Sequence, residues 1–210
     1  YNTDGNFVNS ELLYWGTDYH YTQDIKVLND KEYFVTGHFL DDSVNIHNDT
    51  ILTGRGGQYN AFYAKFRLSD HSLEWAKYND MNNSVRYTNI AQFNDNLFLN
   101  GYFTDSLYFD TKPIKSKNNS RDLFLYSFDQ SGNGQWLRRT YGSANDATAT
   151  LDYDKYGNLY FGGYYRSDDF VADSTESLVS DTSNIRQYWD LFLMKYNKSG
   201  NLQWKKDYGS

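Results

Sequence analysis

The stretch DLFLMKYNKSGNLQW, Asp190 to Trp204, repeats the stretch DLFLYSFDQSGNGQW, Asp122 to Trp136. Nine of the 15 positions are identical at an offset of 68 residues. In both stretches an apolar segment leads into a polar turn containing Ser-Gly-Asn, and a Trp follows the turn. A repeat at this spacing indicates a structural unit that occurs more than once in the chain.

Other residues recur in the same register. Aromatic residues before polar turns stand at Tyr1, Phe66, Phe128 and Tyr196, at separations of 65, 62 and 68 residues. The segments YFVTGHF, LFLNGYF and LYFGGYY share a glycine, and each turn is followed by a tryptophan: these residues are Gly37, Gly101, Gly163, Trp75, Trp136 and Trp204. The register predicts repeats at residues 17–78, 79–140 and 141–210, with residues 1–16 as the outer strand of a preceding or closing unit.

Within each repeat the periodicity is that of β-strands. ATATLDYD (147–154) alternates, KYGN interrupts it and LYFGGYY follows, which predicts a hairpin. WDLFLMKY (189–196) is apolar on both faces, as expected for a strand between two neighbouring sheets. Each repeat is therefore predicted to contain four strands, a to d, and no helix.

Four-stranded units at a fixed period, each with one Trp and Gly-containing turns, are typical of β-propeller blades. The predicted fold is all-β, a β-propeller of four-stranded antiparallel blades. Three blades and one strand cannot close a ring of about four to eight blades, so we expect the chain to be part of a larger ring. An open β-solenoid is the alternative architecture.

The composition limits the class of protein. Forty aromatic residues (21 Tyr, 14 Phe and 5 Trp) among 210 argue against disorder. The net charge of −7 without a basic run argues against nucleic-acid binding, and no apolar run is long enough for membrane insertion. The absence of cysteine excludes disulfides, thiol catalysis and Cys-based zinc sites.

The repeats also resemble a known family. YGSANDATATLDYDKYGNLYFGGYY (141–165) and DLFLMKYNKSGNLQWKKDYGS (190–210) are similar to the bacterial β-propeller repeat called the SBBP repeat. The resemblance covers nearly the whole chain, closely in the third repeat and weakly in the first, where SELLYWG (10–16) departs from the Trp spacing. It implies exported or surface-attached, outer-membrane-associated proteins of the Bacteroidetes type, as substrates or accessories of the secretion and gliding apparatus. It implies no shared catalytic residues.

The repeated polar residues are predicted to be structural. Gly132 and Gly200 supply the positive φ of a tight turn, although Asp129 or Asn197 could instead begin a calcium loop. The three repeated Trp residues are expected to pack between units, with sugar platforms as the alternative. Acidic residues that recur after strand b are expected to cap turns rather than to catalyse. The four His residues lack metal-site spacing, so neither a metal nor a cofactor is expected.

The connections between strands b and c do not repeat. Residues 40–60, 104–121 and 166–188 are long and differ from one another, and variable loops on a regular scaffold commonly bind ligands. In a propeller the b–c and d–a loops emerge on the same face. The candidate binding residues are the Tyr, Trp and Arg residues expected on that face: Arg55, Tyr59, Arg86, Tyr87, Arg121, Arg186, Tyr188 and Trp189. The expected function is a non-catalytic scaffold that binds a protein partner. A carbohydrate-binding module, a propeller lyase or glycosidase, and merely solvated loops remain alternatives.

Overall fold

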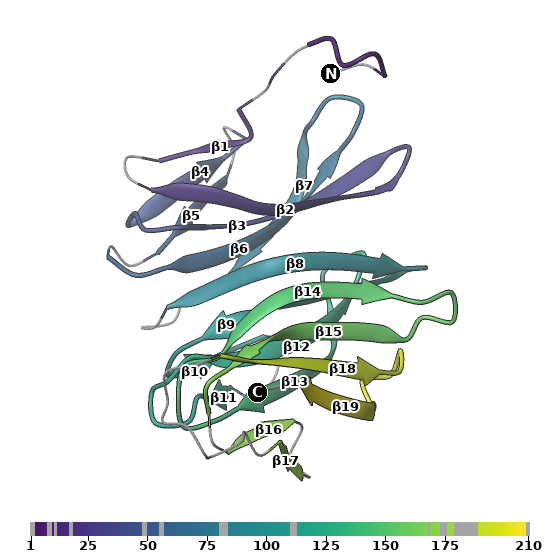
Figure 1. Cartoon of the computed structure of the whole chain (residues 1–210). Coiled ribbons are helices and arrows are strands. Elements are labelled where there is room, and N and C mark those ends of the chain that lie inside the picture. The colour runs from purple at the N-terminus through teal and green to yellow at the C-terminus, as the bar shows by residue number, and fades with distance from the viewer. Residues whose placement is uncertain are drawn as a thin grey trace.

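A computed structural model of the chain is built from β-strands that join into antiparallel sheets (Figure 1). It describes residues 3–7, 10, 12–16, 19–47, 50–54, 57–79, 84–109, 113–167, 169–172, 176–178 and 189–208. The described ranges contain no helix, which confirms the predicted all-β class. Accordingly, no helix in them is long and apolar enough to cross a membrane.

Three sheets contain four consecutive antiparallel strands each. The first sheet is formed, in spatial order, by β2 (His20–Asn29), β3 (Glu32–Phe39), β6 (Asn60–Arg67) and β7 (Leu73–Tyr78). The second is formed by β8 (Val85–Phe93), β9 (Asn96–Phe103), β12 (Asp122–Asp129) and β13 (Gly134–Tyr141). The third is formed by β14 (Ala147–Tyr153), β15 (Leu159–Tyr165), β18 (Asp190–Tyr196) and β19 (Leu202–Tyr208).

The long connections between the second and third strands of these sheets form strands of their own. The first holds β4 (Ser43–Ile46) and β5 (Thr50–Thr53), the second β10 (Ser106–Leu107) and β11 (Ile114–Lys115), and the third β16 (Phe170–Ala172) and β17 (Glu176–Leu178). Each pair is antiparallel, and β16 also pairs with β13, which extends the second sheet to six strands. The connections are thus partly ordered hairpins rather than simple loops.

The segment before the first sheet pairs with the connection between β3 and β6. Residues 1–16 are predicted to form an outer strand; among the described residues of this segment, the strand present is the two-residue β1 (Tyr14–Trp15). It pairs with β4, in a small sheet of order β1-β4-β5. Tyr14 lies edge-on to Phe62 of the first sheet at 5.1 Å between ring centroids. This small sheet therefore covers one face of the first sheet.

The glycine shared by the three repeats lies opposite a bulge in each sheet. Gly37, Gly101 and Gly163 pair with strands β2, β8 and β14 next to a shift in register. A Cβ on any of them would crowd a backbone carbonyl of that strand and approach a phenylalanine ring of the next strand to 2.8–2.9 Å. Only glycine leaves room for the bulged strand and the ring together.

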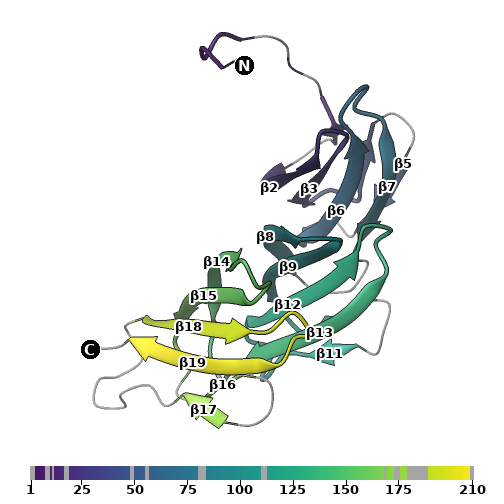
Figure 2. The same ribbon diagram turned by 90° about the vertical axis from the view of Figure 1, so that its right-hand side faces the viewer.

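The sheets follow one another along the molecule and bury aromatic cores between them (Figure 2). Phe34, Ala61 and Tyr63 of the first sheet pack against residues of the second, including Leu97 and Tyr126. The second junction repeats this arrangement, with Phe98, Leu123 and Leu125 facing the third sheet. Strands β6 and β12 are buried on both faces, whereas in β18 Leu191 is exposed and Leu193 and Lys195 on the same face are half-buried. The expectation that 189–196 is covered on both faces is therefore wrong for this structure.

Candidate functional site

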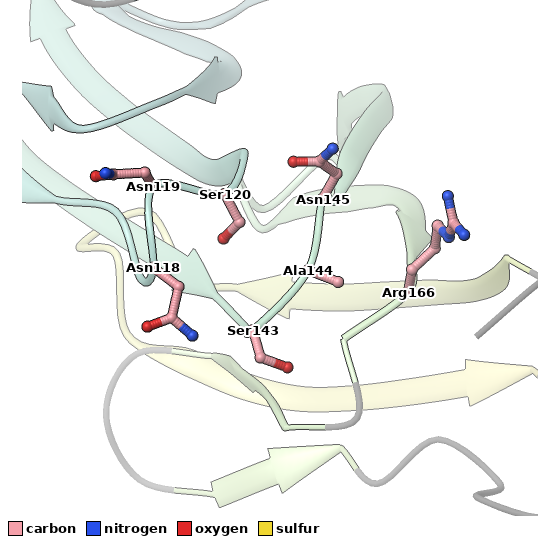
Figure 3. A pocket seen from close by; sticks show the side chains of 7 residues that line it. All are labelled: Asn118, Asn119, Ser120, Ser143, Ala144, Asn145 and Arg166. Atoms are coloured by element: carbon pink, nitrogen blue, oxygen red, sulfur yellow. The ribbon is translucent and has the colours of Figure 1, made fainter. Parts of the chain in front are cut away.

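A polar pocket of about 620 Å³ lies where connections of the second and third sheets meet (Figure 3). One wall is the loop before β12, the next is the loop between β13 and β14, and Arg166 follows β15. Amide, hydroxyl and guanidinium groups make up most of the lining: Asn118, Asn119, Ser120, Ser143, Ala144, Asn145 and Arg166. The Ser143 side chain is hydrogen-bonded to the Asp169 carboxylate, whereas the amides of Asn118 and Asn119 make no hydrogen bond within the part of the chain that the structure describes. The two asparagine amides are therefore available to a polar ligand.

Two buried aspartates hold the walls of this pocket. Asp122 accepts hydrogen bonds from the Lys117 amide at 2.9 Å and the Ser120 hydroxyl at 3.3 Å, which shapes the loop before β12. Asp146 accepts from the Arg166 amide at 3.1 Å and the Ser167 hydroxyl at 3.0 Å, which ties the β13–β14 loop to the end of β15. Both carboxylates are fully buried. They position the loops and do not reach the pocket surface.

A third aspartate completes the connection between the loops. Asp169 Oδ1 accepts a hydrogen bond from the Ser143 amide at 2.7 Å, and its other oxygen pairs with Lys117 Nζ. Asn145 Oδ1 accepts from the Arg121 amide at 2.9 Å. The three loops around the pocket are therefore joined by side chains that each bridge two of them, so their relative positions are defined.

Burial changes the acidity of the two inner carboxyls. Burial raises the pKa of Asp146 to about 7, and the neighbouring Asp122 charge adds to this effect against the hydrogen bonds that oppose it. Burial likewise raises the pKa of Asp122 to about 6, although backbone hydrogen bonds and Arg139 favour its ionised form. The carboxyls of Asp122 and Asp146, which hold the loops of the pocket, therefore change protonation between about pH 6 and 7.

A row of alternating tyrosine and arginine side chains runs toward the pocket. The Arg86 guanidinium lies 3.7 Å from the centre of the Tyr59 ring and 6.0 Å from that of Tyr102. The Arg121 guanidinium lies 5.3 Å from the centre of the same Tyr102 ring. These contacts are within the range of cation–π attraction, which holds each guanidinium over an aromatic surface. Tyr59, Arg86, Tyr102 and Arg121 are called the Arg–Tyr row below.

The predicted binding residues lie in different environments in the structure. Tyr59, Arg86 and Arg121 belong to the Arg–Tyr row, and Trp189 is 41% exposed with the Arg166 guanidinium 5.2 Å from its ring. The prediction is wrong for Tyr87, which is fully buried and packs edge-on against Phe124. Three of the predicted residues lie outside the described ranges: Arg55, Arg186 and Tyr188.

The misplacement of Tyr87 has a simple physical reason. Successive side chains of a strand point to opposite faces, so the neighbours Arg86 and Tyr87 of β8 cannot share one binding surface. Burial raises the pKa of Tyr87 and excludes its hydroxyl from solvent. Tyr102, in contrast, belongs to the Arg–Tyr row but is not among the binding residues predicted from the sequence. Its position was recognisable, since it directly follows Gly101, as His38 follows Gly37 and Tyr164 follows Gly163.

The repeated turns use their polar residues for their own backbone. Asp129 Oδ1 accepts from the Ser131 and Asn133 amides, both at 2.9 Å. Asn197 Oδ1 accepts from the equivalent amides of Ser199 and Asn201, both at 3.0 Å. Gly132 and Gly200 have φ of 83° and 76°. These contacts are those of an Asx-type turn, and they engage the oxygen that a calcium loop would need.

Comparison with protein-family models gives no match for this chain, and comparison with curated protein sequences gives none either.

Proposed function

We propose that this chain is a non-catalytic binding scaffold whose pocket and Arg–Tyr row capture an acidic segment of a partner protein. The observation that carries the proposal is the chain of contacts that joins three arginines. Arg86 and Arg121 share the Tyr102 ring. The Arg121 amide donates to Asn145, which lines the pocket together with Arg166. Arginine and tyrosine are the residue types that most often anchor protein interfaces. A pre-ordered guanidinium also loses less entropy when it binds a carboxylate.

The charge of the chain favours an acidic ligand at these arginines. The net charge is −7, so these three guanidinium groups belong to a chain that is acidic overall. An acidic segment would be attracted to this region and repelled elsewhere, which fixes the site and the orientation of binding. Guanidinium groups bind carboxylates through paired hydrogen bonds, and the asparagine amides of the pocket can accept or donate to a peptide backbone.

The buried aspartates support binding rather than catalysis. A catalytic carboxyl must come within hydrogen-bond reach of the substrate. Asp122 and Asp146 are fully buried and accept hydrogen bonds from the loops that they hold. Their raised pKa values follow from burial and serve no reacting group in this arrangement.

The scaffold itself is proposed to be a segment of a β-propeller. Three sheets with the same strand order, each packed face to face on the next around a shared set of aromatic positions, support this proposal. The resemblance to the SBBP repeat supports an exported or outer-membrane-associated bacterial protein, and a partner within a surface complex.

Carbohydrate binding is the second candidate. The pocket lining is polar apart from Ala144, and Trp189 exposes 41% of its surface close to Arg166. Amide and guanidinium groups bind sugar hydroxyls, and an exposed indole can stack on a sugar ring. This candidate uses Trp189 rather than the Arg–Tyr row.

Fluorescently labelled peptides of acidic, neutral and basic composition, assayed beside a glycan array, separate the two candidates. We expect the acidic peptides to bind most tightly and to lose affinity as salt is raised, because exposed charges are screened. Arg121→Gln is expected to weaken binding about tenfold, the effect of losing roughly 1.4 kcal/mol. Lys155→Gln, in the hairpin turn between β14 and β15, is the matched control and should change nothing. Selective glycan binding that is lost in Trp189→Ala, without peptide binding, would refute the peptide proposal.

A further inference from the structure

Each junction between consecutive sheets contains the same contact between an outer strand and the next sheet's turn. At the first junction the Trp75 indole N–H donates to the Gln130 carbonyl at 3.2 Å, and Lys77 Nζ donates to the Gly132 carbonyl at 2.5 Å. Trp75 and Lys77 are two residues apart on β7, so both side chains point to the same face. The turn 129–133 is thus bound by one aromatic donor and one cation.

The second junction repeats this contact with different residues. The Trp136 indole N–H donates to the Lys198 carbonyl at 3.2 Å, and Arg138 Nε donates to the Gly200 carbonyl at 2.6 Å. The ring of Trp136 lies against the turn 197–201, where a Cβ on Gly200 would come within 2.7 Å of the indole. At the first junction a Cβ on Gly132 would approach Trp75 to 3.1 Å. The contact therefore requires glycine in the turn.

The third sheet carries the same pair of donors in the same register. Trp204 pairs with Lys195 across β18 and β19, as Trp75 pairs with Lys65 and Trp136 with Ser127. Lys206 stands two residues after Trp204, at the place of Lys77 and Arg138. No described residue supplies a turn to this pair: Trp204 contacts Tyr160 and Lys206 of its own sheet.

Two other residues of this sheet face, Leu191 and Tyr164, are exposed, whereas their equivalents in the first two sheets are buried or half-buried. Leu191 is 46% exposed, whereas Ala61 and Leu123, its equivalents in β6 and β12, are fully buried at the junctions. Tyr164 is 42% exposed, whereas His38 at its place in β3 is 2% exposed. In Figure 2 the strands β18 and β19 lie at the end of the series of sheets, beyond the second sheet. We call this surface, made of Tyr160, Tyr164, Leu191, Leu193, Trp204 and Lys206, the terminal face.

We propose that the terminal face is a docking site for a further four-stranded antiparallel sheet whose hairpin turn has the pattern Asp/Asn-x-Ser-Gly-Asn. In the docked state Trp204 and Lys206 donate hydrogen bonds to two carbonyls of that turn, and Leu191 and Tyr164 are covered by its apolar strands. The proposal rests on the two occupied junctions of the chain, which show what residues at these positions bind. It does not depend on the partner of the Arg–Tyr row.

The first sheet of a second copy does not fit this site. Its turn closes with the Arg67 amide donating to the Ser72 carbonyl, as the Asp129 amide donates to Asn133. His71 therefore holds the position of Gly132, with a φ of 55°. A side chain at this position would collide with the indole that has to lie against the turn. The other two turns of a second copy are already bound by its own Trp75 and Trp136.

The test extends the chain by one repeat. The sequence Tyr208-Gly209-Ser210 matches Tyr141-Gly142-Ser143, so a copy of residues 144–210 can follow Ser210 in the natural order. Gln203→Ser in the appended copy, at an exposed position, gives its tryptic peptide a different mass. Hydroxyl-radical oxidation then reports Trp204 of the original sheet and of the appended sheet separately. The appended Trp204 is the internal control for an uncovered indole.

We expect oxidation of the original Trp204 to fall to the level of Trp136, while the appended Trp204 stays as reactive as in the unextended chain. Equal oxidation of both copies overturns the proposal, whether or not the appended sheet folds, because the terminal face is the surface against which it should fold. Gly200→His in the appended copy, which reproduces His71, should restore oxidation of the original Trp204. Protection that survives this substitution refutes the requirement for glycine.

A final arm examines the unextended chain by sedimentation velocity over a range of concentrations. We expect a monomer with reactive Trp204 at every concentration. Self-association that protects Trp204 as concentration rises would assign the terminal face to a second copy and would overturn the proposed occupant.

Discussion

Replacing Gly200 by alanine tests the contact on which the stacking of the sheets depends. The backbone at Gly200 has a φ of 76°, and an alanine there costs about 1–2 kcal/mol. Its Cβ would also lie 2.7 Å from Cδ2 of the Trp136 ring. The ring cannot simply move away, since its N–H binds the Lys198 carbonyl and its face packs near Phe98. Overpacking of this kind costs about 1–3 kcal/mol, so we expect a total loss of about 2–5 kcal/mol.

Two other glycines separate the backbone cost from the packing cost. Gly57 has a φ of 79° with nothing near its Cβ position, so Gly57→Ala should cost only the backbone part, about 1–2 kcal/mol. Gly132→Ala should fall between them, because its Cβ would meet Trp75 at 3.1 Å and the flexible end of Lys77. The measurement is urea denaturation followed by circular dichroism, with an unchanged m-value as evidence that only stability changed.

The expected order of destabilisation is therefore Gly57→Ala, then Gly132→Ala, then Gly200→Ala. A double-mutant cycle with Trp136→Ala should remove most of the excess cost at Gly200, since the colliding ring is then absent. An equal loss for Gly57→Ala and Gly200→Ala would contradict the packing of Trp136 against the turn.

Three further predictions concern the core and the buried titratable groups. Gly101→Ala should cost about 3 kcal/mol or more, because its Cβ would collide with the Arg86 carbonyl and the Phe124 ring; urea denaturation measures this cost. Burial, with a smaller effect of Arg86, lowers the pKa of His38 to about 4 from the usual 6.5, so the folded state binds fewer protons in this range. The contribution of His38 to stability should fall on the order of 3 kcal/mol as pH drops from about 6.5 to 4, and the stability difference between the natural chain and His38→Tyr, which installs the residue of the other two sheets, should change by this amount over that range. The pKa of Asp146 is raised to about 7, so its contribution to the free energy of unfolding has the opposite sign and falls as pH rises from about 4 to 7. Asp146→Asn should remove that fall when urea denaturation is measured across this range.

The repeating part of the fold could be predicted from the sequence because it is encoded locally. Alternating apolar residues, Gly37 and its two equivalents, and the Asx-type turns each act over a few neighbouring residues and recur in every repeat. The same period-two rule could also have shown that Arg86 and Tyr87 face opposite sides. The all-β class and the antiparallel sheets follow from these local signals.

The candidate site depends on contacts that no local pattern encodes. The pocket joins residues 118–120, 143–145 and 166 of three separate loops, and the Arg–Tyr row joins residues from 59 to 121. The non-repeating connections also fold as small hairpins, which their sequences did not indicate. The amino-acid sequence by itself determined the strands, the turns and the order of the repeats, because those are set by neighbouring residues. Only the tertiary structure decided which side chains share a surface and which sheet face is left open, because these depend on how whole sheets stack.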